Sequence, residues 1–246
     1  MNTTRKASTL AHVPVRIGRQ ETLVYLVRHA QTAWNIERRF QGQIDVPLSE
    51  EGLAQAEIVA NWLTSQQSHF TALYTSDLLR ANQTARPIAD RLGLVAQDVA
   101  ALREIHAGEW QGLLTDDIEE LYPGQLARWH READEFRLPG GETIPEVQAR
   151  ICGWYKQAIE AHRGQAIIVV SHGLAIRSLL AALEGWDVAD TERMRKAIMG
   201  NTGVTAVLAD HVTGQNSVLF HNSLAHLEST HSTRDAQERT NEPAAV

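Results

Sequence analysis

Short, continuously apolar segments alternate with longer segments of helical periodicity along most of this chain. The clearest apolar segments cover residues 23–27 and 166–171, and each leads directly into polar residues. Apolar runs of this length are typical of β-strands that are covered on both faces, and strands that alternate with helices form mainly parallel sheets. The sequence therefore predicts an α/β fold with helices on both faces of a central sheet.

Turn and cap residues divide the remaining chain into further elements. Ser49, with Glu50 and Glu51 behind it, is a favourable helix start, and Gly93 is a favourable helix end. Residues 115–137 are expected to form one or two short helices, broken near residues 123–124. Other helices are expected at 78–92, 143–163 and 174–183, and other strands at 72–76, 94–102, 203–209 and 217–220.

These elements predict one folded domain, residues 21–228, between two tails. Of the 246 residues, 43% are hydrophobic and 22% are charged, which is the balance of a globular protein. Residues 1–20 are mixed and basic, without the apolar core of a signal peptide, and residues 229–246 are polar. We expect both end segments to be disordered.

Charge and cysteine content exclude several function classes. The formal net charge of −7 gives no general positive field for nucleic acid or an acidic membrane. No apolar stretch approaches the roughly 18 residues of a membrane span. Cys152 is the only cysteine, so neither an internal disulfide nor a multi-thiolate metal site can form. We expect a cytoplasmic protein that binds neither nucleic acid nor membrane and that holds any anion in a local cationic pocket.

Polar residues follow four of the expected strands, and ligands of open α/β sheets bind beyond the carboxyl ends of the strands. Taken singly, such an arginine is usually solvated and such a histidine usually makes an ordinary structural hydrogen bond. Their convergence favours an anion site, because like charges gathered at one edge repel each other. The residues are Arg28 and His29, then Ser76 with Arg80 a turn later, then Arg103 and Glu104, and finally Ser171, His172 and Gly173.

Phosphate is the anion best suited to two guanidinium groups, since each planar fork can hold its oxygens in a bidentate manner. A neutral imidazole could then attack phosphorus and carry the phosphoryl group covalently. A second histidine would supply positive charge to the equatorial oxygens, and a protonated carboxyl group could protonate the departing oxygen.

Five motifs in order resemble the histidine phosphatase superfamily, in its phosphoglycerate-mutase-like branch and compact phosphatase type. They are R-H-x-x-T at residues 28–32 with Trp34 and Asn35 behind it, RFQGQIDVPLSEEGLAQA, SDLLRANQTA, LREIHAGEWQG and VVSHG. The resemblance covers residues 23–220. It implies a three-layer α/β/α sandwich with a mostly parallel central sheet and a helical lid at about 105–140, in which at least one of Trp110 and Trp129 packs in the core.

The same resemblance implies the roles of the catalytic residues. His29 would be the nucleophile that becomes phosphohistidine, and Arg28, Arg80 and His172 would complete the phosphate pocket. Glu104 would protonate the leaving group and later activate water. The implied activity is metal-independent hydrolysis of a small phosphorylated metabolite, without a cofactor, and a homodimer is compatible with the family.

Four further residues are expected to contact the substrate. Asn35 would donate a hydrogen bond to the phosphate, and the amide of Gly173 would assist because it opens a helix. Arg39 and Gln41 would contact the rest of the substrate. The chain departs from the frequent family pattern at three positions, which leave the assigned chemistry intact but make substrate choice uncertain: Ala30, Gln31 and Gln111.

Two other functions remain open. A phosphoglycerate mutase would use the same phosphohistidine, but mutases of the family carry a longer insertion than the 67 residues (105–171) between Glu104 and His172. A catalytically silent phosphate-binding member usually lacks the nucleophile or an arginine, and this chain keeps them all. A zinc enzyme is disfavoured, because His29 and His172 lack metal-ligand spacing and lie beside arginines.

Overall fold

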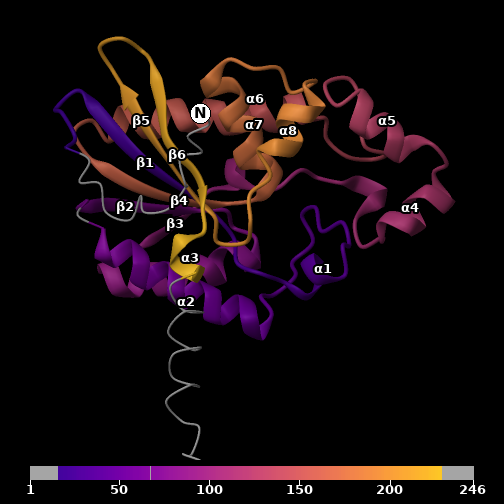
Figure 1. Cartoon of the computed structure of the whole chain (residues 1–246), viewed down its shortest axis with the longest axis horizontal. Coiled ribbons are helices and arrows are strands. Elements are labelled where there is room, and N and C mark those ends of the chain that lie inside the picture. The colour runs from indigo at the N-terminus through magenta and orange to yellow at the C-terminus, as the bar shows by residue number, and fades with distance from the viewer. Residues whose placement is uncertain (1–15, 67, 229–246) are drawn as a thin grey trace, which may run out of the picture.

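The computed structural model describes residues 16–66 and 68–228, which form one six-stranded sheet with helices on both faces (Figure 1). The strand order is β3-β2-β4-β1-β5-β6. The expected tail at 229–246 and most of the expected leader at 1–20 lie outside the described residues. The strands are β1 (Glu21–Arg28), β2 (Phe70–Thr75), β3 (Ala96–Asp98), β4 (Ala166–Ser171), β5 (Val204–Asp210) and β6 (Asn216–Ser223).

The first four strands are parallel, whereas β5 runs antiparallel to both β1 and β6. The sheet is therefore mixed and mostly parallel, as the sequence predicts. In the β1–β4 register Arg28 is paired with Ser171, and in the β2–β4 register Thr75 is paired with Val170. This alignment brings the ends of β1, β2 and β4 to the same level at one edge of the sheet.

Successive side chains of β1 point to opposite faces of the sheet, so they contribute to two separate hydrophobic cores, one on each face. Val24 and Leu26 pack with α6 (Ile144–Ala161) and α7 (Gly173–Glu184), while Leu23, Tyr25 and Val27 pack on the opposite side. That second side is covered by α2 (Glu50–Ser65) and α3 (Leu79–Leu92). The α/β/α arrangement follows directly from these two apolar faces.

The helix boundaries follow the caps that the sequence contains. Ser49 accepts a hydrogen bond from the amide of Gly52 at the start of α2, and Thr143 forms a capping box with Glu146 at the start of α6. Gly93 ends α3 in the left-handed conformation, with φ of 65°. The four long helices were all expected from the sequence.

Residues 115–131 form the two short helices that the sequence predicts, α4 (Thr115–Leu121) and α5 (Gln125–Arg131). Gly124, with φ of 74°, lies in the break between them. Figure 1 shows both helices at one end of the molecule, away from the sheet. Trp110 is fully buried beneath them and packs against Trp129 and Phe136.

The strand expected at 94–102 was predicted too long. Only Ala96–Asp98 pairs with β2, and the chain then turns through a short 3₁₀ helix, η1 (Ala100–Leu102), which buries Leu102. Arg103 and Glu104 therefore follow a turn and not a strand. Two short helices were not predicted: α1 (Ala33–Ile36), which depends on the Thr32 cap, and α8 (Thr191–Lys196). No helix within 16–66 or 68–228 is long and apolar enough to cross a membrane.

Candidate active site

The residues that follow the parallel strands meet in one cavity of about 380 Å³. Arg28 and His29 enter it from the end of β1, Arg80 from the first turn of α3, and Glu104 from the loop after η1. His172 lies directly behind His29, with 5.2 Å between the two ring centroids. We call this cavity the phosphate pocket. Of the residues predicted to contact the substrate, Asn35, Gln41 and Gly173 also line it.

His29 is held in a single orientation by its own neighbour. Its Nδ1 lies 2.7 Å from the carbonyl oxygen of Ala30, and because a carbonyl only accepts, Nδ1 carries the proton. The lone pair is therefore on Nε2. Burial lowers the pKa of His29 well below its ordinary value, and the positive charges of Arg80 and Arg28 lower it further. At neutral pH this imidazole is uncharged and nucleophilic.

Backbone carbonyls fix the two arginines of the pocket. Arg80 donates from Nη1 to Ile44 O at 2.9 Å and from Nη2 to Gly42 O at 2.7 Å, while Arg28 donates from Nη1 to Met199 O. The Nε atom of each is buried and has no hydrogen-bond partner in the part of the chain that the structure describes. Buried donors of this kind cost free energy unless a ligand accepts from them.

Burial also lowers the pKa of both guanidinium groups, that of Arg80 to about 10. Both still stay protonated at neutral pH, because the guanidinium group of arginine does not lose its proton in proteins. Two fixed positive charges beside a neutral imidazole form a site for an anion, and not for a metal ion. No group of three or more His, Cys, Asp or Glu residues suited to a metal ion occurs within the described ranges.

His172 supplies a polar atom to the same region without lining the cavity. Its Nε2 lies 2.8 Å from the hydroxyl oxygen of Ser76, and its buried Nδ1 has no partner among the described residues. Burial, followed by the charge of Arg80, lowers the pKa of His172 well below its ordinary value. The lowered pKa favours the neutral ring when no anion is bound, and a bound phosphate dianion would raise that pKa. The positive charge expected at His172 stays a prediction for the phosphate-bound protein.

Glu104 lies at the N-terminal end of α7. Its Oε1 accepts hydrogen bonds from the amides of Ile105 at 3.0 Å and Ala175 at 3.2 Å, and its Oε2 accepts from Leu174 at 3.1 Å. The carboxyl group thus reaches the pocket between the loop after η1 and the start of α7.

Arg150 holds the backbone that carries Glu104, a role that the sequence does not reveal. From α6 it donates to the carbonyl oxygens of Ala101, Arg103 and Glu104 at 2.9, 2.6 and 2.9 Å. It also makes a two-point ion pair with Glu142, which in turn accepts from the amide of His106. All five N–H donors of Arg150 are used in fixing this loop.

The loop after β1, which carries His29, is also held by hydrogen bonds from two helices. The amide of Ala30 donates to Thr84 Oγ1 on α3, and the amide of Gln31 donates to Gln55 Oε1 on α2. Asn35 accepts from the amide and hydroxyl of Thr32 through Oδ1, which closes the cap of α1.

Gly173 lies beside Arg28: a Cβ atom at Gly173 would be in ordinary van der Waals contact with Arg28 Nε, at 3.4 Å. The side-chain oxygen of Gln41 is buried and has no partner within the described ranges. Arg39, by contrast, is not brought into the phosphate pocket. Its guanidinium donates to Glu37 Oε2 at 2.9 Å and to the carbonyl of Gly112, and lies over the Trp34 ring.

Several residues of the phosphate pocket have no individual role in the sequence-based predictions. Trp129 and His130 reach the cavity from α5, and Arg177 reaches it from α7. Trp129 and His130 lie in the segment expected to form the lid, and Arg177 lies in the helix that follows His172. No sequence motif distinguishes these three residues from their neighbours.

The comparison with protein families agrees with this geometry. Residues 24–222 match the model of the histidine phosphatase superfamily (branch 1).

Individual relatives include phosphatases and a mutase. The chain is 36% identical over 163 residues, 66% of this chain and 76% of the relative, to phosphoserine phosphatase 1 of Hydrogenobacter thermophilus. It is 37% identical over 175 residues, 70% of this chain and 79% of the relative, to a probable phosphoglycerate mutase of Yersinia pestis. Among solved structures, a mycobacterial glucosyl-3-phosphoglycerate phosphatase superposes with a TM-score of 0.74 at 31% identity, covering 82% of this chain and 99% of that one.

Proposed function

The chain belongs to branch 1 of the histidine phosphatase superfamily, and from this we propose that it is a metal-independent phosphomonoester hydrolase. Its substrate would be a small phosphorylated metabolite and its intermediate a phosphohistidine at His29. One observation carries the proposal: unpartnered buried nitrogen atoms of Arg28, Arg80 and His172 surround a neutral histidine whose lone pair is on Nε2. A phosphate group would accept hydrogen bonds from these nitrogens.

The first chemical step would transfer the phosphoryl group to the protein. His29 Nε2 attacks phosphorus, the bond from phosphorus to the ester oxygen breaks, and the departing oxygen takes a proton from Glu104. Arg28 and Arg80 stabilise the charge that gathers on the equatorial oxygens. For this step the Glu104 carboxyl group must carry a proton and release at least one of its amide contacts with α7.

The second step would return His29 to its starting state. Glu104, now ionised, takes a proton from a water molecule as that water attacks phosphorus. The bond from phosphorus to nitrogen breaks, and inorganic phosphate leaves. Asn35 and the amide of Gly173 would hold the phosphate through both steps.

The decisive experiment is hydrolysis of p-nitrophenyl phosphate in the presence of EDTA, with phosphoserine and 3-phosphoglycerate tested beside it. We expect release of inorganic phosphate that EDTA does not inhibit, and a covalent phosphoprotein that is labile to acid. His29→Ala should lose both turnover and labelling. Because a nucleophile and its partners act as a unit, adding Arg80→Ala should cost little more. Near-normal activity of His29→Ala would rule out the mechanism.

A phosphoglycerate mutase is the second candidate, favoured by the similarity to the probable mutase of Yersinia pestis. A mutase would convert 3-phosphoglycerate to 2-phosphoglycerate without releasing phosphate. Measuring 2-phosphoglycerate as well as inorganic phosphate in the reaction with 3-phosphoglycerate therefore separates the two functions, and a protein with neither activity would be a phosphate-binding member.

A further inference from the structure

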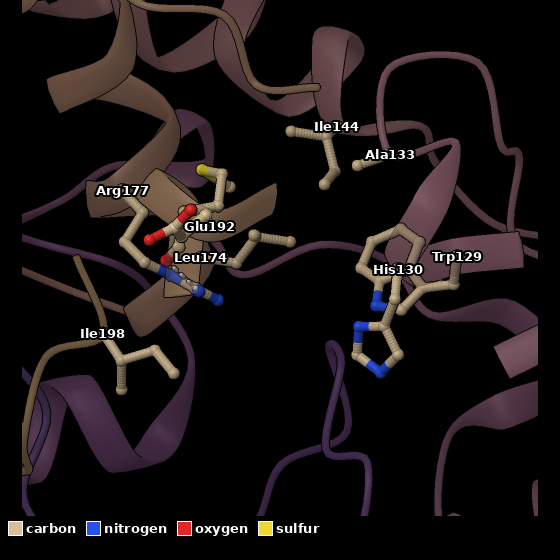
Figure 2. A pocket seen from close by; sticks show the side chains of 9 residues that line it. Trp129, His130, Ala133, Ile144, Leu174, Arg177, Glu192 and Ile198 are labelled. Carbon is tan, nitrogen blue, oxygen red and sulfur yellow. Dashed lines mark hydrogen bonds between the residues drawn. The ribbon is translucent and has the colours of Figure 1, made fainter. Parts of the chain in front are cut away.

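A second and larger cavity, of about 740 Å³, adjoins the phosphate pocket (Figure 2). Five residues line both cavities, so the two are continuous: Trp129, His130, Leu174, Arg177 and Ile198. Ala133, Ile144, Glu192 and Met194 line only the larger one. We call this cavity, defined by all nine residues, the leaving-group pocket. An ester whose phosphate lies at His29 would extend past Leu174 into it.

The walls of the leaving-group pocket are mainly apolar. Trp129 and His130 present planar rings from α5, and Figure 2 shows them across the cavity from Leu174 and Ile198. Ala133, Ile144 and Met194 contribute buried apolar surface. Water against such walls is readily displaced by an apolar group, and planar rings pack well against a planar ligand.

Two charged residues, Arg177 and Glu192, lie in one wall of the leaving-group pocket. Arg177 donates from Nη1 to Met194 O at 3.0 Å and from Nε to Gly173 O at 3.3 Å. Glu192 pairs with Lys196 at 2.6 Å and comes from the same side of the cavity as Arg177 (Figure 2). Because Glu192 already pairs with Lys196, its charge does not offset that of Arg177, and this wall keeps one positive charge beside its apolar surface.

Its size also argues against a small leaving group. A water molecule occupies about 30 Å³ of liquid, so a three-carbon alcohol would leave most of this cavity filled with water. We propose that the leaving-group pocket selects phosphomonoesters of bulky alcohols that carry a planar apolar group, in preference to esters of small alcohols such as phosphoserine or phosphoglycerate. This specificity rests on the proposed phosphatase function.

The test uses substrates that differ in size but not in leaving-group chemistry. Ethyl phosphate and 2-(1-naphthyl)ethyl phosphate both release a primary alcohol, so a difference in kcat/KM reports binding in the leaving-group pocket. We expect kcat/KM to be at least tenfold higher for the naphthylethyl ester, which should also exceed phosphoserine and 3-phosphoglycerate. Equal values for the two alkyl esters, or a preference for the carboxylated ones, would overturn the inference while the phosphatase function stands.

A variant that fills the leaving-group pocket tests whether the apolar group of the substrate binds there. Ala133→Phe places a ring in the leaving-group pocket and should lower the ratio of the two kcat/KM values about tenfold. Ala161→Phe makes the same change at an exposed position at the far end of α6 and should keep the wild-type ratio. An unchanged ratio in Ala133→Phe would place the apolar group elsewhere.

Two further measurements test the specificity if Ala133→Phe does not fold or if the wild-type protein hydrolyses neither ester. If Ala133→Phe does not fold, Ile198→Gln replaces it, because Ile198 is 53% exposed and its substitution leaves the core intact; the ratio should fall at least threefold. If the wild-type protein hydrolyses neither ester, the proposed function fails. Calorimetric binding of ethylphosphonate and 2-(1-naphthyl)ethylphosphonate then decides the specificity alone, with tighter binding of the naphthyl compound expected and equal binding contradicting it.

Discussion

The role of His29 depends on its protonation state, because only a neutral imidazole has a lone pair to attack phosphorus. Burial is the largest cause of its lowered pKa, and the charges of Arg80 and Arg28 add to it. The arginines therefore act twice in the proposed mechanism: they bind the phosphate, and they keep the nucleophile uncharged at a pH where an exposed histidine would be partly protonated.

Removing one of these charges should raise the pKa of His29. We expect wild-type His29 to titrate well below pH 6.5, and Arg80→Met to titrate closer to that value, because a cation no longer opposes the imidazolium. NMR titration of histidine-labelled protein would measure both, with the His29→Ala spectrum assigning the resonance. Arg91→Met, an exposed arginine on the same helix paired with Glu57, is the control and should leave the pKa unchanged. A lower or unchanged pKa in Arg80→Met would contradict the argument.

Arg150 is a positioning residue for Glu104, since it holds the backbone of that loop and not the substrate. We expect Arg150→Met to lower kcat strongly for an alkyl phosphate, whose leaving oxygen needs a proton, and only modestly for p-nitrophenyl phosphate, whose leaving group does not. Glu104→Gln should show the same dependence on the leaving group.

Arg137→Met is the matched control for Arg150. Arg137 also forms a two-point ion pair with a glutamate of this region, Glu146, but makes no contact with Glu104. Arg137→Met should therefore leave kcat for the alkyl phosphate and for p-nitrophenyl phosphate near the wild-type values. If Arg150→Met lowered the two rates by the same factor, its role would be general support of the fold.

At the level of elements, the sequence was most informative where a strand fixes a residue's position. Arg28, Ser76 and His172 could be placed at one sheet edge because parallel strands in register end together. The same could not be done for residues that reach the site from helices, because their position depends on how each helix packs against loops far away in the chain. These residues are Trp129, His130, Arg150 and Arg177. The short β3 shows the same limit: the sequence predicts a short strand around 94–102, but only three of these residues pair at the edge of the sheet.

The start of α2 approaches the loop that carries His29 closely, and this requires Gly52. A Cβ atom there would lie 1.9 Å from the carbonyl oxygen of Gln31, which is backbone and cannot move aside cheaply. We expect Gly52→Ala to destabilise the protein by about 1–3 kcal/mol, as overpacking does, and to lower kcat by displacing the loop that holds His29. Urea unfolding and the p-nitrophenyl phosphate assay would measure the two effects.

Gly153 gives the matched control within another helix. It is exposed in the interior of α6, and a Cβ atom there would meet nothing within 4 Å. Gly153→Ala should therefore stabilise the protein by about 0.5–1 kcal/mol through helix propensity, without a change in activity. Equal effects of the two substitutions would mean that the close approach at Gly52 is unimportant.

For the whole molecule, the buried histidines make folding sensitive to mild acid. His29, His172 and His226 are at most 3% exposed, and burial lowers the pKa of each, that of His226 to about 4. In the unfolded chain a histidine has a pKa near 6.5. Between these values the unfolded chain binds more protons than the folded one, so the stability that the neutral rings contribute is complete above about pH 6.5 and is lost as pH falls.

We therefore expect the free energy of unfolding to fall from pH 7 to pH 5, with a slope of up to about 1.4 kcal/mol per pH unit for each histidine that stays neutral in the fold. Paired carboxylates such as Glu146, with a pKa lowered to about 2 from 4.5, lose their contribution only at lower pH, so this range isolates the histidines. Urea unfolding at pH 7, 6 and 5 measures the slope. His226→Gln, which removes one of the titrating rings but none from the phosphate pocket, should make it shallower. Stability that stays constant or rises toward pH 5 would mean that these histidines are protonated in the folded protein, and His29 would then lack the lone pair that the proposed mechanism needs.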